Sequence, residues 1–352
     1  MVSSKEDIEK FGYDGGTFSR NEIELAKRKN IPLTLDLAIP GNCRNNCFFC
    51  GYRKSTPNGL TLEEIFSIVD QFKKIGGRSI KILGEGEPLL RSDILEILGY
   101  IHKSNIKPVL FTCGDTIGDE KLARRIHGLS NREIIEKLAK FNVTVMLKYE
   151  KDNEDEIVGR KGFSGLRNKT LGLLKETGFN KFYPTHLGFG IVVLRANLKE
   201  IPKVYETAIR ENIYPLLCPL MPIGRVKDRK YRDKVGVTGK RLTYLTARLH
   251  KIASKRGIKL AGPADFPGGK PCDISRAGFY VDGNGDVLIC ESDDVVGNIR
   301  ENSLKELWLK VSKMKDKKYG KCRWEGKCFP KRKTGVILRD YDQVVKGLIG
   351  NS

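Results

Sequence analysis

The sequence contains no apolar run long enough to span a bilayer, and its first residues lack the apolar core of a signal peptide. It also contains no low-complexity tract and no internal repeat beyond an alternation of strand-like and helix-like segments. These absences argue against a membrane-spanning or secreted protein. Nine cysteines, an odd number in a chain without a secretion signal, favour a reducing compartment, the cytoplasm, and metal ligation over disulfides.

Acidic side chains are scarce relative to basic ones. The 352 residues include 64 Lys and Arg against 43 Asp and Glu, which gives a formal net charge of +21 at pH 7. Such an excess favours an anionic partner: nucleic acid, a phosphorylated or carboxylated substrate, or an anionic lipid surface. A generally basic, solvated surface explains the charge equally well. At this length the chain can bury a large core in one or two domains.

Three cysteines fall within eight residues, in the order Cys43-Arg-Asn-Asn-Cys47-Phe-Phe-Cys50. They directly follow an apolar segment, 33–39, whose pattern predicts a strand. Three thiolates on one tight loop can hold three corners of a cubane iron–sulfur cluster. No fourth cysteine is close in the sequence, so one iron stays open to bind and reduce a ligand. The alternative is half of a zinc site.

Strand-like and helix-like segments alternate along the chain. Strands are expected at 33–39, 79–83, 109–112, 143–148, 187–193 and 214–218, and helices at about 61–75, 93–103, 131–141, 164–177, 197–211 and 241–256. This order predicts an α/β fold of parallel strands with helical crossovers. Six units are too few for the closed eightfold barrel, so we expect a partial (β/α)6 TIM barrel, open on one side. Ligands of such folds lie at the carboxyl ends of the strands, where the cysteine loop begins.

The CxxxCxxC spacing after the first strand, with Phe49 before the last cysteine, resembles the radical S-adenosylmethionine (radical SAM) superfamily. The resemblance implies that Cys43, Cys47 and Cys50 hold a [4Fe-4S] cluster whose open iron chelates the amino and carboxylate groups of SAM, with Phe49 among the SAM contacts. One electron from the cluster then cleaves SAM to a 5′-deoxyadenosyl radical, which abstracts a hydrogen atom from a substrate. The partial barrel is also the fold of that family.

The segment Gly84-Glu-Gly-Glu-Pro88 follows the second strand and resembles the family's Gly-Gly-Glu-Pro turn. Glu85 stands where the family has its first glycine. The resemblance therefore carries over to Gly86, Glu87 and Pro88, which would hold the ammonium group of SAM. A plain surface turn is the alternative.

Three further positions match the family at the ends of later strands. Thr112 lies in a turn similar to the family's Thr-Asn-Gly, which implies a contact with SAM. Lys148, or its neighbour Tyr149, stands where relatives contact the ribose. Asn197 lies in a turn similar to one in the relatives that make the molybdopterin precursor, and the alternative is a simple helix N-cap. Cys113, within the Thr112 turn, is expected to be a packed thiol.

Four cysteines near the C-terminus, Cys272, Cys290, Cys322 and Cys328, form a second group. Residues 277–290 predict a β-hairpin with an Asp-Gly-Asn-Gly turn. The pattern resembles the auxiliary-cluster domain called SPASM, or its shorter form, twitch. The resemblance implies one auxiliary [4Fe-4S] cluster that moves electrons, with an open iron if one of the last two cysteines is not a ligand. The alternative is a four-thiolate zinc site.

Two segments concentrate positive charge. They comprise Arg225, Lys227, Arg229, Lys230, Arg232 and Lys234, and then Lys313, Lys315, Lys317, Lys318, Lys321, Arg323, Lys327, Lys331, Arg332 and Lys333. Both can attract an anionic substrate, bind RNA or dock an acidic flavodoxin or ferredoxin, although an aromatic-interleaved RNA-binding signature is missing. A solvated lysine face is the alternative.

Cys218, at the end of the sixth strand, either faces substrate or is a small core residue.

The sequence thus predicts a radical SAM oxidoreductase that abstracts hydrogen from an anionic substrate and passes an electron to the auxiliary cluster. The alternatives are a peptide-maturing or RNA-modifying relative and, outside enzymes, a zinc or nucleic-acid-binding protein. No general base or nucleophile can be identified. The expected parts are an N-terminal extension (1–30), the barrel (31–225), a basic helical linker (226–265), the auxiliary-cluster domain (266–335) and a tail (336–352).

Overall fold

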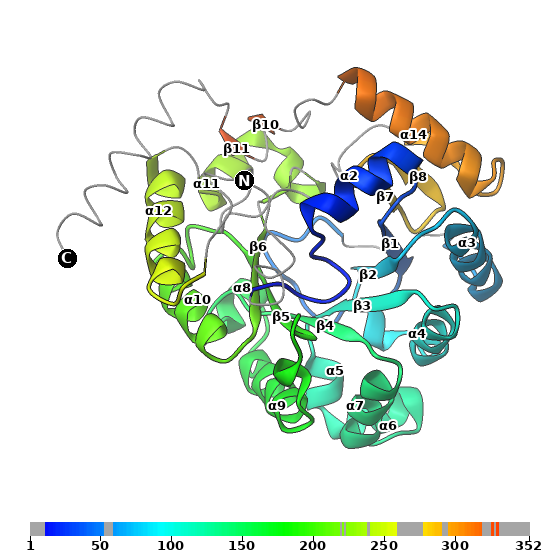
Figure 1. Ribbon diagram of the computed structural model, residues 1–352. Coiled ribbons are helices and arrows are strands. Elements are labelled where there is room, and N and C mark those ends of the chain that lie inside the picture. The colour runs from blue at the N-terminus through cyan, green and yellow to red at the C-terminus, as the bar shows by residue number, and fades with distance from the viewer. Residues whose placement is uncertain are drawn as a thin grey trace.

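The computed structural model describes residues 11–52, 59–218, 220–221, 223–237, 240–258, 277–290, 295–318, 325–326 and 329–330. Nine strands form one sheet, in which β1 to β6 line the centre of the molecule (Figure 1). The strands of this sheet are β1 (Thr34–Pro40), β2 (Ser79–Glu85), β3 (Lys107–Thr112), β4 (Thr144–Lys148), β5 (Leu187–Val192), β6 (Tyr214–Cys218), β7 (Gly278–Val281), β8 (Asp286–Leu288) and β9 (Val295–Asn298). A separate pair joins β10 (Glu325–Gly326) to β11 (Phe329–Pro330).

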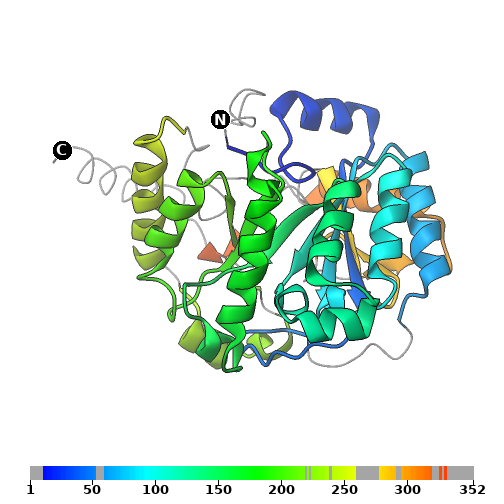
Figure 2. The same cartoon turned by 90° about the horizontal axis from the view of Figure 1, so that it is seen from below.

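Helices surround these strands on the outside (Figures 1 and 2). They are α2 (Arg20–Lys29), α3 (Leu62–Lys74), α4 (Ile94–Lys103), α5 (Asp115–Gly118), α6 (Glu120–His127), α7 (Asn131–Lys140), α8 (Asp155–Val158), α9 (Phe163–Glu176), α10 (Ile201–Arg210), α11 (Arg229–Val235), α12 (Lys240–Ser254) and α14 (Leu304–Lys318), with 3₁₀ turns η1 (Pro88–Leu90), η2 (Phe179–Lys181) and η3 (Gly224–Lys227). Capping boxes begin α2, α3 and α7, because a Ser or Thr at each N-cap pairs with a Glu three residues later. None of the described helices is long and apolar enough to cross a membrane.

The order of the sheet is β6-β5-β4-β3-β2-β1-β7-β8-β9, and β1 to β6 are all parallel. Alternate residues of β1 explain why the strand is buried on both faces. Leu35 and Leu37 pack outward into the main hydrophobic core with the helices, while Ala38 packs with Tyr280 in a separate inner cluster. The predicted partial barrel of six parallel strands is therefore confirmed, and each strand lies within two residues of its expected bounds.

The predicted C-terminal hairpin is also present, and it joins the barrel sheet. β7 pairs in parallel with β1, and β8 returns antiparallel to β7. Gly285 has a φ of +83°, so the Asp-Gly-Asn-Gly turn uses a conformation that favours glycine. The hairpin thereby brings the segment that ends at Cys290 to the β1 side of the barrel.

The N-terminal segment closes the opposite end of the barrel from the cysteine loop. Tyr13 is 2% exposed and packs in a cluster with Val109, Met146 and Tyr214. Asp14 forms an ion pair with Lys107 at 2.7 Å, and its carboxylate lies 3.2 Å from Nε2 of His186. These contacts fix the amino ends of the strands, so the carboxyl ends form the mouth of the barrel.

Several elements differ from the sequence-based expectations. The helix expected to begin at Asn197 begins at Ile201, so the N-cap interpretation of Asn197 is wrong. Short helices α5, α6, α8 and α11 lie in segments for which no helix was predicted. Their length explains the omission, because a helix of one or two turns shows no clear apolar periodicity.

Candidate functional site

The cysteine loop leaves the carboxyl end of β1 and is held by backbone contacts on two sides. The amides of Asn46 and Phe48 donate to the carbonyls of Val158 and Ile157, at 2.9 and 3.2 Å. On the other side, the Glu87 amide donates to the Asn42 carbonyl at 2.8 Å. The loop is thus fixed between α8 and the turn that follows β2.

Gly86 allows the close approach of this turn to the cysteine loop. Its φ is +140°, a value that side chains rarely adopt, and a Cβ atom there would lie 2.2 Å from the carbonyl oxygen of Gly41. Only a glycine fits this position without moving the backbone. Gly86 therefore has a structural reason to be glycine that is independent of any ligand.

The three loop thiols lie close enough to influence one another's protonation. A Cys50 thiolate would raise the pKa of both Cys43 and Cys47. Burial is the larger cause. Together with the nearby negative charges, it raises the pKa of Cys43 to about 11 and that of Cys47 to about 12. All three cysteines nevertheless keep part of their surface exposed, Cys43 the most, so the loop is not enclosed in the core.

The spacing of the three loop sulfurs does not match that of thiolates on a single zinc ion. Thiolates that share one tetrahedral zinc lie about 3.8 Å apart, since each Zn–S bond measures about 2.3 Å. Within the described part of the chain, the one trio of ligand atoms that all lie within 4.8 Å of one another belongs to Glu87, Cys113 and Asp115. The sulfurs of Cys43, Cys47 and Cys50 do not all lie within that distance of one another, so they are not arranged around one zinc ion. Three thiols on one loop, with no fourth cysteine close in the sequence, are the donor set that a cubane iron–sulfur cluster with one open iron needs.

Glu87 turns its carboxylate inward, toward β3. It accepts hydrogen bonds from the Thr112 hydroxyl at 2.5 Å, the Cys113 amide at 2.7 Å and the Leu89 amide at 3.1 Å. Burial and the nearby Asp115 raise the pKa of Glu87 above its usual value. The structure thus joins Glu87 and Thr112, and Pro88 is buried beside them at the start of η1.

Cys113 is a packed thiol, as expected. It is 7% exposed and lies in a small apolar cluster with Phe163, against which Cys47 packs. Its Sγ donates to Asp115 at 2.8 Å, and burial raises its pKa well above the usual value. These hydrogen bonds account for the close trio of Glu87, Cys113 and Asp115 without a metal ion.

Arg160 is a candidate that the sequence analysis missed. Its Nη1 donates to Asp115 at 2.6 Å, whereas its Nη2 is buried and has no hydrogen-bond partner among the described residues. The guanidinium lies over the Phe163 ring, with its carbon 5.3 Å from the centroid. A buried donor without a partner is costly, so Nη2 is suited to an anionic ligand. The two glycines that flank Arg160-Lys161 were the available signal, since they mark a tight turn carrying two cations.

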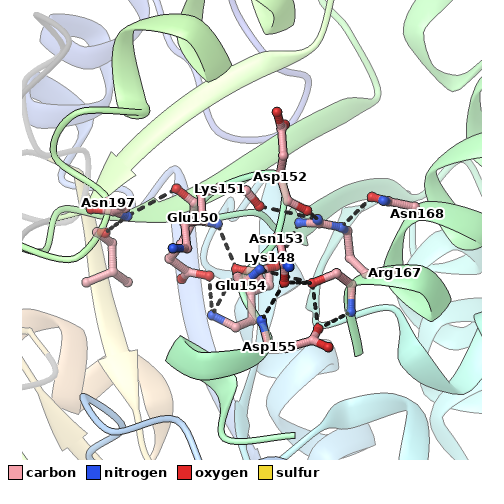
Figure 3. Close-up of polar contacts among 12 residues, drawn as sticks. Lys148, Glu150, Lys151, Asp152, Asn153, Glu154, Asp155, Arg167, Asn168 and Asn197 are labelled. Carbon is pink, nitrogen blue, oxygen red and sulfur yellow. Dashed lines mark hydrogen bonds and ion pairs between the residues drawn. The ribbon is translucent and has the colours of Figure 1, made fainter. Parts of the chain in front are cut away.

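Lys148 ends β4 and lies in a buried network of charges (Figure 3). Its Nζ forms ion pairs with Glu150 and, at 3.8 Å, with Glu154. It also lies 4.8 Å from the centroid of the Phe49 ring, which brings a predicted SAM contact beside the cysteine loop. Burial alone lowers the pKa of Lys148, but the two carboxylates outweigh it and hold the pKa above its usual value. Lys148 therefore stays charged at neutral pH.

The same network anchors the segment after β4 to the barrel wall. Arg167 is fully buried and pairs with Glu154 at 2.7 Å (Figure 3). Its guanidinium carbon lies 3.6 Å from the centroid of the Tyr149 ring, which makes a cation–π contact. Tyr149 in turn stacks on Phe189 with centroids 4.2 Å apart. Of the two candidates on this strand, Lys148 lies closer to the cysteine loop.

Asn197 is fully buried, and its side-chain amide forms hydrogen bonds with backbone groups. Its Oδ1 accepts from the Leu194 amide at 2.9 Å, and its Nδ2 donates to the carbonyls of Val192 at 2.8 Å and Glu150 at 3.2 Å (Figure 3). These bonds join the ends of β4 and β5. Its predicted contact with SAM stays a prediction.

The auxiliary site is described in part. Cys290 follows β8 and is partly exposed, whereas Cys272, Cys322 and Cys328 lie outside the described residues. The hydroxyls of Tyr52 and Tyr280 lie 3.0 Å apart and connect the cysteine loop to the hairpin. Cys218 is partly exposed at the carboxyl end of β6. The cysteine loop and the hairpin that ends at Cys290 are therefore in direct contact.

Comparison with known sequences agrees with this arrangement. Residues 37–208 match the model of the radical SAM superfamily, and residues 272–329 match that of an iron–sulfur cluster-binding domain, SPASM. The chain is 26% identical over 310 residues to the AdoMet-dependent heme synthase of Methanosarcina barkeri, covering 79% of this chain and 82% of that protein. It is 27% identical over 176 residues to a probable GTP 3′,8-cyclase of Methanocaldococcus jannaschii, covering 49% of this chain and 54% of that protein.

Solved structures share the fold. The structure of anSMEcpe with bound AdoMet has a TM-score of 0.59 at 19% identity, covering 91% of this chain and 96% of that one. Streptococcus suis SuiB bound to S-adenosylmethionine has a TM-score of 0.57 at 21% identity, covering 82% and 69%. The radical SAM domain binds a 4Fe-4S cluster and SAM, and the SPASM domain binds auxiliary iron–sulfur clusters. The chain is therefore an enzyme of the radical SAM superfamily with a C-terminal SPASM domain.

Proposed function

We propose that this enzyme cleaves SAM reductively at the mouth of the barrel and uses the product to abstract hydrogen from an anionic substrate. The observation that carries the proposal is the position of Cys43, Cys47 and Cys50 on one partly exposed loop after β1, with sulfurs that do not all lie within 4.8 Å of one another. When bound, the cluster and SAM supply a 5′-deoxyadenosyl radical, which removes a hydrogen atom from a carbon of the substrate.

The residues of the chain hold and orient these groups. In this proposal Cys43, Cys47 and Cys50 each ligate one iron and leave the fourth open. Arg160 binds the carboxylate of SAM through its unpartnered Nη2, which would complete the hydrogen bonding of a buried donor. Glu87 acts by fixing the turn before η1, since its carboxylate is already occupied by Thr112 and two backbone amides.

We further propose that the substrate, once it has lost a hydrogen atom, gives one electron to an auxiliary [4Fe-4S] cluster held by Cys272, Cys290, Cys322 and Cys328. The position of Cys290 at the end of the hairpin beside β1 supports this role. The same proposal divides the chain into a barrel, a basic linker and an auxiliary-cluster domain at 31–225, 226–265 and 266–335.

Two observations support an anionic substrate. The net charge of +21 attracts carboxylates and phosphates toward the protein. Two relatives, both from Methanosarcina barkeri, are named AdoMet-dependent heme synthase and Fe-coproporphyrin III synthase, so carboxylated tetrapyrroles belong in the first group of compounds to test.

The test is anaerobic reconstitution followed by a dithionite-driven assay of SAM cleavage. We expect bound iron and sulfide, the visible absorbance of an iron–sulfur chromophore, and release of 5′-deoxyadenosine that a panel of carboxylated tetrapyrroles, anionic metabolites and acidic peptides stimulates. Cys43→Ala should abolish cleavage. Cys290→Ala should retain some cleavage but form no product.

Two results would contradict the proposal. Purified protein that contains zinc but neither iron nor sulfide would support a zinc-binding protein instead. Full product formation by Cys290→Ala would remove the auxiliary cluster from the electron path, while leaving SAM cleavage intact. Cys113→Ala is a matched control, because it removes a thiol that packs beside Cys47 but lies outside the proposed ligand set.

A further inference from the structure

A cluster of exposed cations lies on η3 and α11, in the segment that follows β6. Its members, named here the basic ledge, are Arg225, Lys227, Arg229, Lys230 and Lys234. In the part of the chain that the structure describes, one ion pair involves the ledge: Arg229 lies 3.7 Å from Asp233, and both side chains are well exposed. Exposed pairs of this kind contribute little stability, so folding does not explain the ledge.

The ledge is attached directly to the cysteine loop. The Tyr231 hydroxyl of α11 donates to the carbonyl of Phe48 at 2.9 Å. A Cβ atom on Gly224 would lie 2.1 Å from the carbonyl oxygen of Gly51, so the two backbones are in close contact. Val226 is fully buried in an apolar cluster against which Phe48 packs. Figure 2 shows the blue loop after β1 and the yellow-green α11 along the same end of the barrel.

The basic ledge is therefore an exposed, positively charged surface directly beside the loop that is proposed to hold the SAM-binding cluster. We propose that the basic ledge is the docking surface for an acidic one-electron carrier protein, which reduces the cluster held by Cys43, Cys47 and Cys50. The inference rests on the proposed function. The carrier loses one electron and the cluster gains one, with no proton transferred, and one electron is consumed for each SAM cleaved.

Charge complementarity, together with the lack of an exposed aromatic ring on α11, favours an acidic protein over RNA as the partner of the basic ledge. The five cations of the basic ledge lie beside the cysteine loop and can steer an acidic protein surface to it. Such electrostatic steering raises association rates mainly at low salt. RNA is disfavoured, because the one aromatic side chain of α11, Tyr231, turns its hydroxyl to Phe48 and is only partly exposed. Single-stranded RNA binding usually needs exposed aromatic rings for stacking.

The experiment uses the reconstituted holoenzyme and flavodoxin as the probe. The ledge variant carries Lys227→Glu, Lys230→Glu and Lys234→Glu, and the control carries Lys121→Glu, Lys137→Glu and Lys140→Glu on α6 and α7. Both variants change the net charge equally, and the control sites are exposed on the opposite side of the barrel from α11 (Figure 1). Iron content is compared with that of the wild type to confirm that both variants are assembled.

Two readouts are measured: the Kd for oxidised flavodoxin from its flavin fluorescence, and 5′-deoxyadenosine release driven by flavodoxin hydroquinone or by dithionite. We expect the ledge variant to raise the Kd at low salt by about tenfold or more and to slow flavodoxin-driven cleavage similarly. The control should change the Kd by roughly twofold, because its charges are more than a Debye length from the ledge. Dithionite-driven cleavage should be unchanged in both.

Equal effects of the two variants would overturn the proposal, as would a ledge variant that binds flavodoxin like the wild type. A short RNA that displaces flavodoxin, and whose binding the ledge variant weakens, would assign the surface to nucleic acid instead. Absence of dithionite-driven cleavage in the wild type would contradict the proposed function, while the binding measurement would still report on the ledge.

Discussion

Replacing Gly86 with alanine tests whether the turn after β2 holds the cysteine loop in place. The new Cβ would lie 2.2 Å from the carbonyl oxygen of Gly41 and 2.8 Å from that of Asn42, whereas such contacts are essentially never below 3.0 Å. Both neighbours are backbone atoms, so the turn and the loop must separate by roughly 1 Å.

The cost can be worked from two contributions. A side chain at a φ of +140° stores strain of about 1–3 kcal/mol. Separation also weakens the 2.8 Å hydrogen bond from the Glu87 amide to Asn42, which contributes about 1 kcal/mol. We therefore expect Gly86→Ala to lower the free energy of unfolding by about 2–4 kcal/mol, and to lower iron binding because the loop carries the three thiols.

The assay compares urea denaturation and iron content after anaerobic reconstitution. Gly165→Ala is the control, because Gly165 lies within α9 and a Cβ atom there would have no neighbour within 4 Å. Alanine in a helix should raise stability by about 0.5–1 kcal/mol and leave iron binding unchanged. A Gly86→Ala variant with the stability and iron content of the wild type would refute the reasoning.

Three further changes have expected results. Arg167→Met leaves Glu154 buried without its partner at 2.7 Å, and should lower the free energy of unfolding in urea by about 3–5 kcal/mol. Burial lowers the pKa of His250 to about 4, whereas the unfolded chain keeps a value of about 6.5, so between these values the unfolded chain binds more protons than the folded one. This group alone should therefore make the protein about 2 kcal/mol less stable at about pH 5 than at about pH 7. His250→Gln should remove this loss of stability. Tyr280→Phe removes the hydroxyl contact with Tyr52, and should cost about 1 kcal/mol and alter the EPR signal of the reduced loop cluster.

For each of these three changes, one result would contradict the expectation. An Arg167→Met variant as stable as the wild type would mean that Lys148, 3.8 Å away, is a sufficient partner for Glu154. Identical pH profiles for the wild type and His250→Gln would show that this imidazole is not protonated differently in the folded and unfolded chains. An unchanged EPR signal in Tyr280→Phe would mean that the hairpin does not influence the loop.

The sequence predicts the barrel well because its strands are short, apolar and separated by capped helices. Thr61 and Ser130 each begin a capping box that starts a helix within one residue of the expected position. The cysteine loop is equally local, since three cysteines within eight residues lie near one another whatever the rest of the fold is. Such features depend on nearby residues alone, so the sequence carries them directly.

Contacts between distant segments could not be predicted in the same way. The pairing of β7 with β1 joins residues more than 200 positions apart, and no local pattern selects β1 as the partner strand. The polar neighbours of Arg160 arise likewise from the tertiary fold, which brings α8 beside the turn after β3. Asn197 resembled a helix cap because Asn often caps helices, yet its amide is used to join two strand ends.

In the proposed function, the loop of Cys43, Cys47 and Cys50 holds a cluster with an iron open to SAM. The most direct test is EPR of the reduced Cys290→Ala protein, with the auxiliary site disabled, recorded before and after SAM is added. We expect the signal of a reduced [4Fe-4S] cluster that changes when SAM binds, and that is missing when Cys43 is also replaced by alanine. A signal that SAM leaves unchanged, or that survives the loss of Cys43, would contradict it.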